Sequence, residues 1–377
     1  MASSLGPPVS IEGELGVRVS AAGGRVSRAS ARAERPRVAG RLFAGRPADE
    51  APVLAGTLFA ICGRSQAIGS RTAVEAARGE EPSAGLRAAR DARIAAETVQ
   101  EHAWRFLVDW PRLAGRAPDV VGLARGRKVL APLLEAGEDT FDVRARDEAL
   151  AWARDAIFGR LPTEFLAIDS IAALQPWIDE AGTPVASLAG ELLGRIPSLG
   201  ASDVDILPYG DDRWVGMALA PAIDGDERFD EAPHWRGGAR ETGALARTAG
   251  HPLVADAIGR WGRGVGARVV ARLVDLAAAL EAAGGRHGAI RLGEDSAIAW
   301  VETARGLLVH RVRLDGGRIG SYRIVAPTEW NFHPDGAFAR GAMAIPAGDA
   351  AQLESDVRWL VSTLDPCVAV RYEAGHA

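Results

Sequence analysis

The sequence predicts an α+β fold, in which a long helical core is flanked by β-hairpins near the two ends of the chain. Alternating polar and apolar residues surround glycine turns near both ends, and helical spacing of apolar residues fills the middle. The composition, with 47% hydrophobic and 25% charged residues, is typical of a globular protein. A chain of 377 residues can bury a large core, and we interpret residues 1–377 as a single domain.

Residues 11–35 are expected to form an N-terminal β-hairpin. The stretches "ELGVRVS" and "RVSRASA" alternate in character on the two sides of Gly23 and Gly24. Adjacent glycines permit the positive φ angles that a tight hairpin turn requires. The turn chemistry and the alternation therefore predict the same element.

Residues 49–200 are expected to form the first part of the helical core. One helix begins near the start of this range and is expected to end at Gly63, just after Cys62. A long helix is predicted over residues 86–110 and is expected to stop at Pro111. Further helices are predicted over residues 147–159, 164–182 and 185–196.

The second half of the chain is expected to alternate between irregular, helical and strand segments. Residues 203–240 are rich in Gly, Pro and Asp, which predicts an irregular surface excursion. Residues 241–285, the second part of the helical core, contain the clearest helix of the chain, which ends at two adjacent glycines. Residues 286–377 are expected to hold a β-hairpin around the turn "DGG", a helix over 349–363 and a C-terminal cysteine segment.

Charge and hydropathy exclude two classes of partner. The net charge is −5 and the arginines are interspersed with acidic residues, so we expect no nucleic-acid binding. The longest apolar helical stretch, "ARVVARLVDLAAALEAA", is interrupted by charged residues, and we expect no membrane insertion. The first residues lack the basic start and apolar centre of a secretory signal, which predicts a cytoplasmic location.

The two cysteines are the main candidates for chemistry, because two are too few for a disulfide framework. Cys62 is followed by Gly63 and Arg64, and backbone dipoles plus a guanidinium at a helix start favour a thiolate. The alternative is a buried thiol that packs as a small hydrophobe. Cys367 follows Asp365 and a proline, and its alternative is a tail cysteine without a role.

Other common sites are not indicated. The seven histidines include no pair with H-x-x-x-H spacing, which argues against a zinc site. The pattern G-x-S-x-G is also absent, so an esterase lacks its nucleophile elbow. The cysteine segments therefore carry the strongest signal in the chain.

Both cysteine segments, together with others in the same order, resemble the large subunit of nickel-iron hydrogenases. That family carries R-x-C-G-x-C near its start and D-P-C-x-x-C-x-x-H at its end. The segment "IEGELGVRV" resembles the family's I-E-G-H-x-R, and "GGARETGALAR" resembles E-x-G-P-L-A-R. Likewise "ETARGLLVHRV" resembles E-A-P-R-G, and "YRIVAPTEWNFHP" resembles I-x-x-P-T-T-W-N. The resemblance covers nearly the whole chain and implies a large-subunit-like fold.

The departures from the family pattern concern the metal ligands. Cys62 and Cys367 match the first cysteine of each pair, whereas the bridging positions hold Ser65 and Val370. The family's final histidine falls on Glu373, and the arginine before the first motif falls on Ala60. Valine has no donor atom and serine is a poor soft ligand, so a bridged nickel-iron pair cannot be held in the usual way. We therefore expect no nickel and no catalysis of hydrogen turnover.

The residues that surround the iron in the family have counterparts in this sequence. Arg305 and Thr328 match the residues that in the family donate hydrogen bonds to the cyanide ligands of the iron, which suits a guanidinium and a hydroxyl. In the alternative interpretation they are a salt-bridge partner and a turn hydroxyl. Asp365 and Ser65 are expected in the same pocket. Glu12 matches the glutamate that passes protons near the metals.

A large-subunit scaffold with half of the thiolates resembles the HupK and HoxV type of hydrogenase accessory protein. This resemblance implies a scaffold that binds iron with cyanide and carbon monoxide ligands transiently, through Cys62 and Cys367. The implied partners are maturation proteins that deliver iron and the hydrogenase large-subunit precursor. Two alternatives stay open, namely a degenerate metal-binding redox subunit and a metal-free decoy that binds chaperones.

Overall fold

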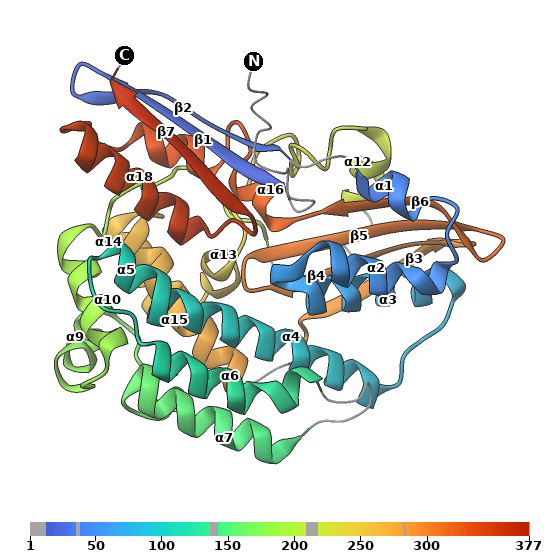
Figure 1. The fold of residues 1–377 in the computed structure, drawn as a ribbon, viewed down its shortest axis with the longest axis horizontal. Helices are drawn as coiled ribbons and strands as arrows, with labels where there is room; N and C mark the ends of the chain where they lie inside the picture. Colours follow the sequence, from blue (N-terminus) through green and yellow to red (C-terminus); the bar gives the residue numbers. More distant parts are fainter. Residues whose placement is uncertain (1–12, 35–37, 136–141, 209–217, 282–283, 377) are drawn as a thin grey trace, which may run out of the picture.

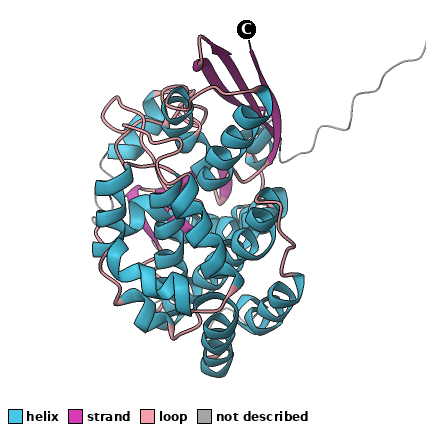
Figure 2. Ribbon diagram, turned by 90° about the vertical axis from the view of Figure 1, so that its left-hand side faces the viewer, coloured by secondary structure: helices cyan, strands magenta, loops and turns pink. Residues whose placement is uncertain are grey.

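The computed structural model describes residues 13–34, 38–135, 142–208, 218–281 and 284–376. The helices of the first half are α1 (Val38–Phe43), α2 (Ala51–Leu58), α3 (Gly63–Arg78), α4 (Ala84–Trp104), α5 (Trp110–Leu113), α6 (Val120–Glu135), α7 (Val143–Ala153), α8 (Pro162–Leu166), α9 (Ile171–Glu180) and α10 (Pro184–Arg195). Those of the second half are α12 (Ala220–Gly225), α13 (Ala244–Thr248), α14 (Pro252–Trp261), α15 (Val265–Glu281), α16 (Pro327–Asn331), α17 (Ala337–Met343) and α18 (Ala350–Leu364). Figure 2 shows that helices make up most of the body.

A three-stranded sheet joins the two ends of the described chain (Figure 1). Strands β1 (Glu14–Ala22) and β2 (Arg25–Glu34) form the predicted N-terminal hairpin. The C-terminal strand β7 (Ala369–His376) pairs with β1 in parallel, which the sequence did not predict. The inward residues of β1 are apolar and pack on α17 and α18, so the sheet covers the end of the chain that carries Cys367.

The second sheet is a four-stranded antiparallel meander, β3 (His287–Gly293), β4 (Ser296–Thr303), β5 (Gly306–Asp315) and β6 (Arg318–Val325). The predicted hairpin corresponds to β5 and β6, and two further strands precede it. Helix α3 packs on this sheet and contacts β3, β4 and β5. Helix α3 therefore covers one face of this sheet.

Helix α15 runs through the centre of the helical part (Figure 1). Nearly all of its side chains are buried, including three charged ones, Arg268, Arg272 and Asp275. The clearest helix predicted from the sequence is thus confirmed. Its charges, which the sequence shows as interruptions of an apolar stretch, lie inside the protein and form ion pairs there. Within the described part of the chain, no helix is both long and apolar enough to cross a membrane.

Two predictions about helix ends were wrong. Gly63 does not end a helix but begins α3, because α2 already stops at Leu58. Pro111 does not stop the long helix, which continues through a π-helical turn, Arg105–Asp109, into α5. A proline near the start of a helical segment is tolerated, since its missing N–H would have no partner there.

The excursion predicted over 203–240 is also not confined to the surface. Its apolar side chains Leu207, Leu219, Ile223 and Phe229 are buried against β4, β5 and Trp330. The segment additionally forms α12. Burial of apolar area stabilises this irregular segment even though its glycines and prolines disfavour long regular elements.

Candidate functional site

Cys62 lies at the junction of two helices and only 6% of it is exposed. It ends a short 3₁₀ turn, Ala60–Cys62, and immediately precedes α3. The side-chain amide of Gln66, one turn along α3, donates toward the Cys62 sulfur over 3.9 Å. The sulfur thus lies beside the positive end of a helix, which is the setting that the sequence analysis expected, and the thiolate itself stays a prediction.

Glu97 of α4 binds the first turn of α3. Its carboxylate accepts the backbone N–H groups of Arg64 at 3.1 Å and of Ser65 at 3.0 Å, and it also accepts the Ser65 hydroxyl. Burial raises the pKa of Glu97, and the hydrogen bond from Ser65 acts in the opposite direction. The Ser65 hydroxyl is therefore engaged with Glu97, and the expected part of Ser65 in binding a cargo stays a prediction.

Cys367 is held by a hydroxyl from a distant segment. The Thr328 Oγ1 atom, in α16, lies 3.0 Å from the Cys367 sulfur and accepts the Cys367 backbone N–H at 3.1 Å. Asp365, two residues earlier, has a left-handed backbone with φ of 56°, which turns the chain sharply after α18. This turn brings Cys367, 7% exposed, into contact with Thr328.

Arg305 connects the surroundings of the two thiols. Its side chain is buried in the β4–β5 turn, and its Nη2 donates to Glu101 of α4 at 2.9 Å. Burial lowers the pKa of Arg305, but the negative charges of Asp365, Glu101, Cys367 and Cys62 together raise it above its ordinary value. Both cysteines therefore lie within electrostatic reach of one guanidinium.

Asp365 is enclosed by three arginines. Arg105 reaches its Oδ1 through Nε at 2.8 Å and Nη2 at 2.5 Å, and Arg272 donates to its Oδ2 at 2.8 Å. The Nε atom of Arg305 lies 3.4 Å from Oδ1. Burial raises the pKa of Asp365, but these cations outweigh burial and hold the pKa well below its usual range. The three arginines therefore favour the ionised form of Asp365.

One face of α4 lines the site at three successive turns. Glu97, Glu101 and Arg105 are spaced by four residues and therefore lie on the same side of the helix. They bind, in order, the start of α3, the β4–β5 turn through Arg305, and the α18–β7 segment through Asp365. The sequence interpretation missed these residues, although charged residues at a spacing of four along one helix face were a signal.

A buried charge network extends from Asp365 into the protein. Arg272 donates to Nδ1 of His102 at 3.0 Å, and Nε2 of His102 contacts Asp275 at 2.7 Å. Because an arginine can only donate, His102 Nδ1 must accept and its Nε2 must carry the proton. Burial lowers the pKa of His102 to about 4, so the imidazole is neutral. Arg247 then links Asp275 to Glu302.

The segments that carry the family resemblance pack on one another. The Asn331 side chain accepts the Thr242 N–H at 2.9 Å, and the Thr242 hydroxyl accepts the Leu307 N–H at 2.9 Å. Nearby, Arg268 of α15 forms a buried two-point ion pair with Glu241. Segments that lie far apart in the sequence are thus joined by hydrogen bonds and an ion pair next to the β4–β5 turn, which contains Arg305.

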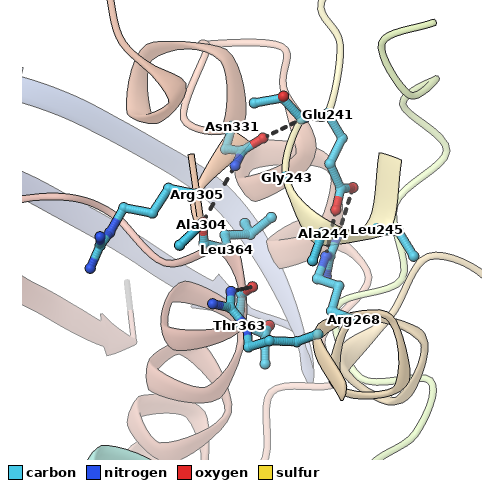
Figure 3. Close-up of a pocket in the computed structure, with 12 residues that line it drawn as sticks. Glu241, Gly243, Ala244, Leu245, Arg268, Ala304, Arg305, Asn331, Thr363 and Leu364 are labelled. Carbon is cyan, nitrogen blue, oxygen red and sulfur yellow. Dashed lines mark hydrogen bonds and ion pairs between the residues drawn. The ribbon is translucent and has the colours of Figure 1, made fainter. Parts of the chain in front are cut away.

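A small polar cavity lies among these segments (Figure 3). Its accessible volume is about 10 Å³, which is room for one water molecule. Glu241, Arg268 and Asn331 lie around it, and the labelled Arg305 side chain extends away from it. Arg305 and Arg272 also line the cavity, so it adjoins the surroundings of Asp365.

Among the predicted residues, Thr328 contacts Cys367 and Asp365 lies 3.4 Å from Arg305, while both cysteines act electrostatically on Arg305. Glu12 lies outside the described residues. On β7, the exposed Glu373 pairs with Arg18 of β1 at 2.7 Å. In the described part of the chain no group of three or more His, Cys, Asp or Glu side chains could hold a metal ion. Any metal at this site would thus depend on the cysteines and on ligands of its own.

Curated relatives match along most of their length, although no family model matches the chain. The chain is 34% identical over 361 residues to the hydrogenase expression/formation protein HoxV of Cupriavidus necator, with 90% of this chain and 91% of that protein covered. It is 31% identical over 379 residues to the hydrogenase expression/formation protein HupK of Rhizobium leguminosarum bv. viciae, with 95% of each covered.

Solved structures share the fold. A Ni-Fe-Se hydrogenase from D. vulgaris Hildenborough, 19% identical, superposes with a TM-score of 0.58 over 92% of this chain and 94% of that chain. The enzyme from Desulfomicrobium baculatum, 16% identical, superposes with a TM-score of 0.61 over 93% and 95%. At these identities the similarity concerns the fold alone, and it confirms the predicted large-subunit-like architecture.

Proposed function

Because the chain belongs to the family of hydrogenase expression/formation proteins that includes HoxV and HupK, we propose that it is a scaffold in nickel-iron hydrogenase maturation. In this role it binds iron that carries cyanide and carbon monoxide, and it releases this cargo to the hydrogenase large-subunit precursor. Maturation proteins that deliver the iron are the donor partners. The protein itself is not a catalyst of hydrogen turnover in this proposal.

One observation carries the proposal. Two buried cysteines from distant segments lie at the two ends of one contact network centred on Arg305. Arg305 donates to Glu101, one turn of α4 from the Glu97 that binds the helix start after Cys62, and its Nε lies 3.4 Å from Asp365, two residues before Cys367. Buried thiols that serve only as packing need no cation beside them. Two cysteines that can bind a metal as thiolates, beside a guanidinium, instead suit a soft transition metal with anionic ligands.

The remaining groups match the chemistry of the cargo. Cyanide bound to iron is an anionic acceptor, and both Arg305 and the Thr328 hydroxyl are donors in the buried site. With Cys62 and Cys367 as the protein ligands, the iron would be held by fewer bonds than four cysteines provide. Weaker coordination supports release, which a scaffold requires and a resident cofactor site does not.

Infrared spectroscopy tests the proposal on protein purified without oxygen from cells that make hydrogenase. The expected result is carbon monoxide and cyanide stretches, with iron and without nickel by metal analysis. The variants Cys62→Ser and Cys367→Ser should lose these bands, because serine is a poor soft ligand. A surface variant such as Arg144→Ala, whose side chain is 89% exposed, should retain them.

Two other results would replace the proposal. Nickel in the purified protein, together with hydrogen-dependent dye reduction, would indicate a degenerate redox subunit. Absence of metal, together with normal hydrogenase maturation in cells that carry either cysteine-to-alanine variant, would indicate a metal-free decoy. Both outcomes differ from the loss of maturation that we expect on removing either thiol.

A further inference from the structure

Arg305 keeps one buried donor without a hydrogen bond. Its Nη2 donates to Glu101, but Nε is buried and forms no hydrogen bond with any residue that the structure describes. The nearest carboxylate oxygen, Oδ1 of Asp365, is 3.4 Å away, which makes an ion pair without the geometry of a hydrogen bond. Buried donors are nearly always paired, so this one needs an explanation.

Arg105 explains this unpaired donor, because its side chain already contacts the same carboxylate oxygen, Oδ1 of Asp365. Both Nε and Nη2 of Arg105 contact Oδ1 of Asp365, at 2.8 and 2.5 Å, while Arg272 takes Oδ2 at 2.8 Å. Asp365 is fully buried and its carboxylate is shared among three cations. The shorter contacts of Arg105 leave Arg305 as the weakest partner of Oδ1.

The backbone of α4 places Arg105 for this contact. Arg105 is the first residue of the π-helical turn Arg105–Asp109, and its Nη1 also contacts Asp109 four residues later. A π-helical turn inserts one residue into a helix and commonly occurs at functional sites. The side chain of Arg105 is 19% exposed, so it reaches from the surface to the buried Asp365.

We propose that Arg105 is a positioning residue, which holds Asp365 away from the Nε–H of Arg305 and so keeps this donor open for an acceptor ligand of the iron cargo. This inference rests on the proposed function, since the acceptor it names is iron-bound cyanide. It predicts that without Arg105 the Asp365 carboxylate moves onto Arg305 Nε. The donor would then be satisfied within the protein and lost to the cargo.

The first test needs no cargo. In the full-length, metal-free protein labelled with ¹⁵N-arginine, the Nε–H resonance of Arg305 should move downfield and exchange more slowly with water in Arg105→Gln. Arg105→Lys keeps one charged donor and should stay near the native position. Arg112→Gln is the matched control, because it makes the same substitution at an exposed arginine of the adjoining helix α5.

The second test uses protein loaded in cells that make hydrogenase. Loss of one charge-assisted hydrogen bond to the cargo should lower iron retention about tenfold in Arg105→Gln and shift the cyanide stretches, with partial recovery in Arg105→Lys. If the glutamine variant does not fold, Arg105→Met, which keeps the unbranched stem, takes its place. An unchanged Arg305 resonance would overturn the role of Arg105 alone, whereas absence of iron-bound cyanide in the native protein would overturn the proposed function.

Discussion

The Thr328 hydroxyl lies 3.0 Å from the sulfur of Cys367 and also accepts the backbone N–H of the same residue at 3.1 Å. One side chain thus fixes both the backbone and the sulfur of a candidate ligand. Thr328→Val should lower the free energy of unfolding by about 1 to 3 kcal/mol, because the buried N–H of Cys367 loses its acceptor. Urea unfolding measures this loss.

Thr328→Ser is the matched control, since it retains the hydroxyl. It should recover most of the lost stability and keep the carbon monoxide and cyanide bands of loaded protein. Equal stability of the valine variant and the native protein would mean that the Thr328–Cys367 contact contributes nothing to folding.

The glycine after Arg305 sets the shape of the β4–β5 turn. Gly306 has φ of 125°, and a Cβ there would lie 2.5 Å from the Thr242 side chain. Gly306→Ala should therefore cost about 2 to 4 kcal/mol, from backbone strain and overpacking together. Gly317→Ala is the control, with φ of 78° and open space around its Cβ, and it should cost only about 1 kcal/mol. Similar thermal unfolding of the two variants would contradict the clash with Thr242.

The ion pair between Arg268 and Glu241 is buried, with side-chain exposures of 3% and 2%. Glu241→Leu should lower the free energy of unfolding by about 3 to 5 kcal/mol, because it leaves an uncompensated charge in the interior. The exposed pair of Arg144 and Glu148 provides the comparison, and Arg144→Ala should cost no more than about 0.5 kcal/mol. Denaturant unfolding of both variants at one pH checks the contrast.

His102 predicts a specific dependence of stability on pH. Burial lowers its pKa from 6.5 to about 4, so the unfolded chain binds a proton in this range that the folded protein does not. The contribution of His102 to stability is therefore full above pH 6.5 and is lost as the pH falls toward 4, on the order of 3 kcal/mol in total.

His102→Gln isolates this effect, because an amide can still accept from Arg272 and donate to Asp275. Glu97 changes the pH dependence of stability in the opposite direction, because burial raises its pKa. The native protein and the His102→Gln variant both contain Glu97, so its effect cancels in the comparison. The difference in unfolding free energy between native and variant should shrink or reverse as the pH falls from 6.5 to 4. Parallel pH profiles would show that His102 is not the group responsible.

Much of the architecture could be predicted from local patterns. The glycine turn predicted the β1–β2 hairpin, apolar spacing predicted α15, and the order of the motif segments implied the large-subunit fold. The same motifs selected Cys62, Cys367, Arg305, Thr328 and Asp365. The structure shows Thr328 against Cys367 and Asp365 against Arg305, and the binding roles stay predictions. Periodicity and turn chemistry are properties of neighbouring residues, so a sequence displays them directly.

The sequence alone determined which side chains are available to the candidate site, namely two cysteine thiols, the Thr328 hydroxyl and several arginines. Only the tertiary structure decided how the charges are shared. Arg105 and Asp365 are separated by 260 residues, yet their contact decides which donor of Arg305 is left open. Such pairings arise when hydrophobic burial forces charged groups into a common interior, where each must find a partner. No local pattern in a sequence reports which partner it finds.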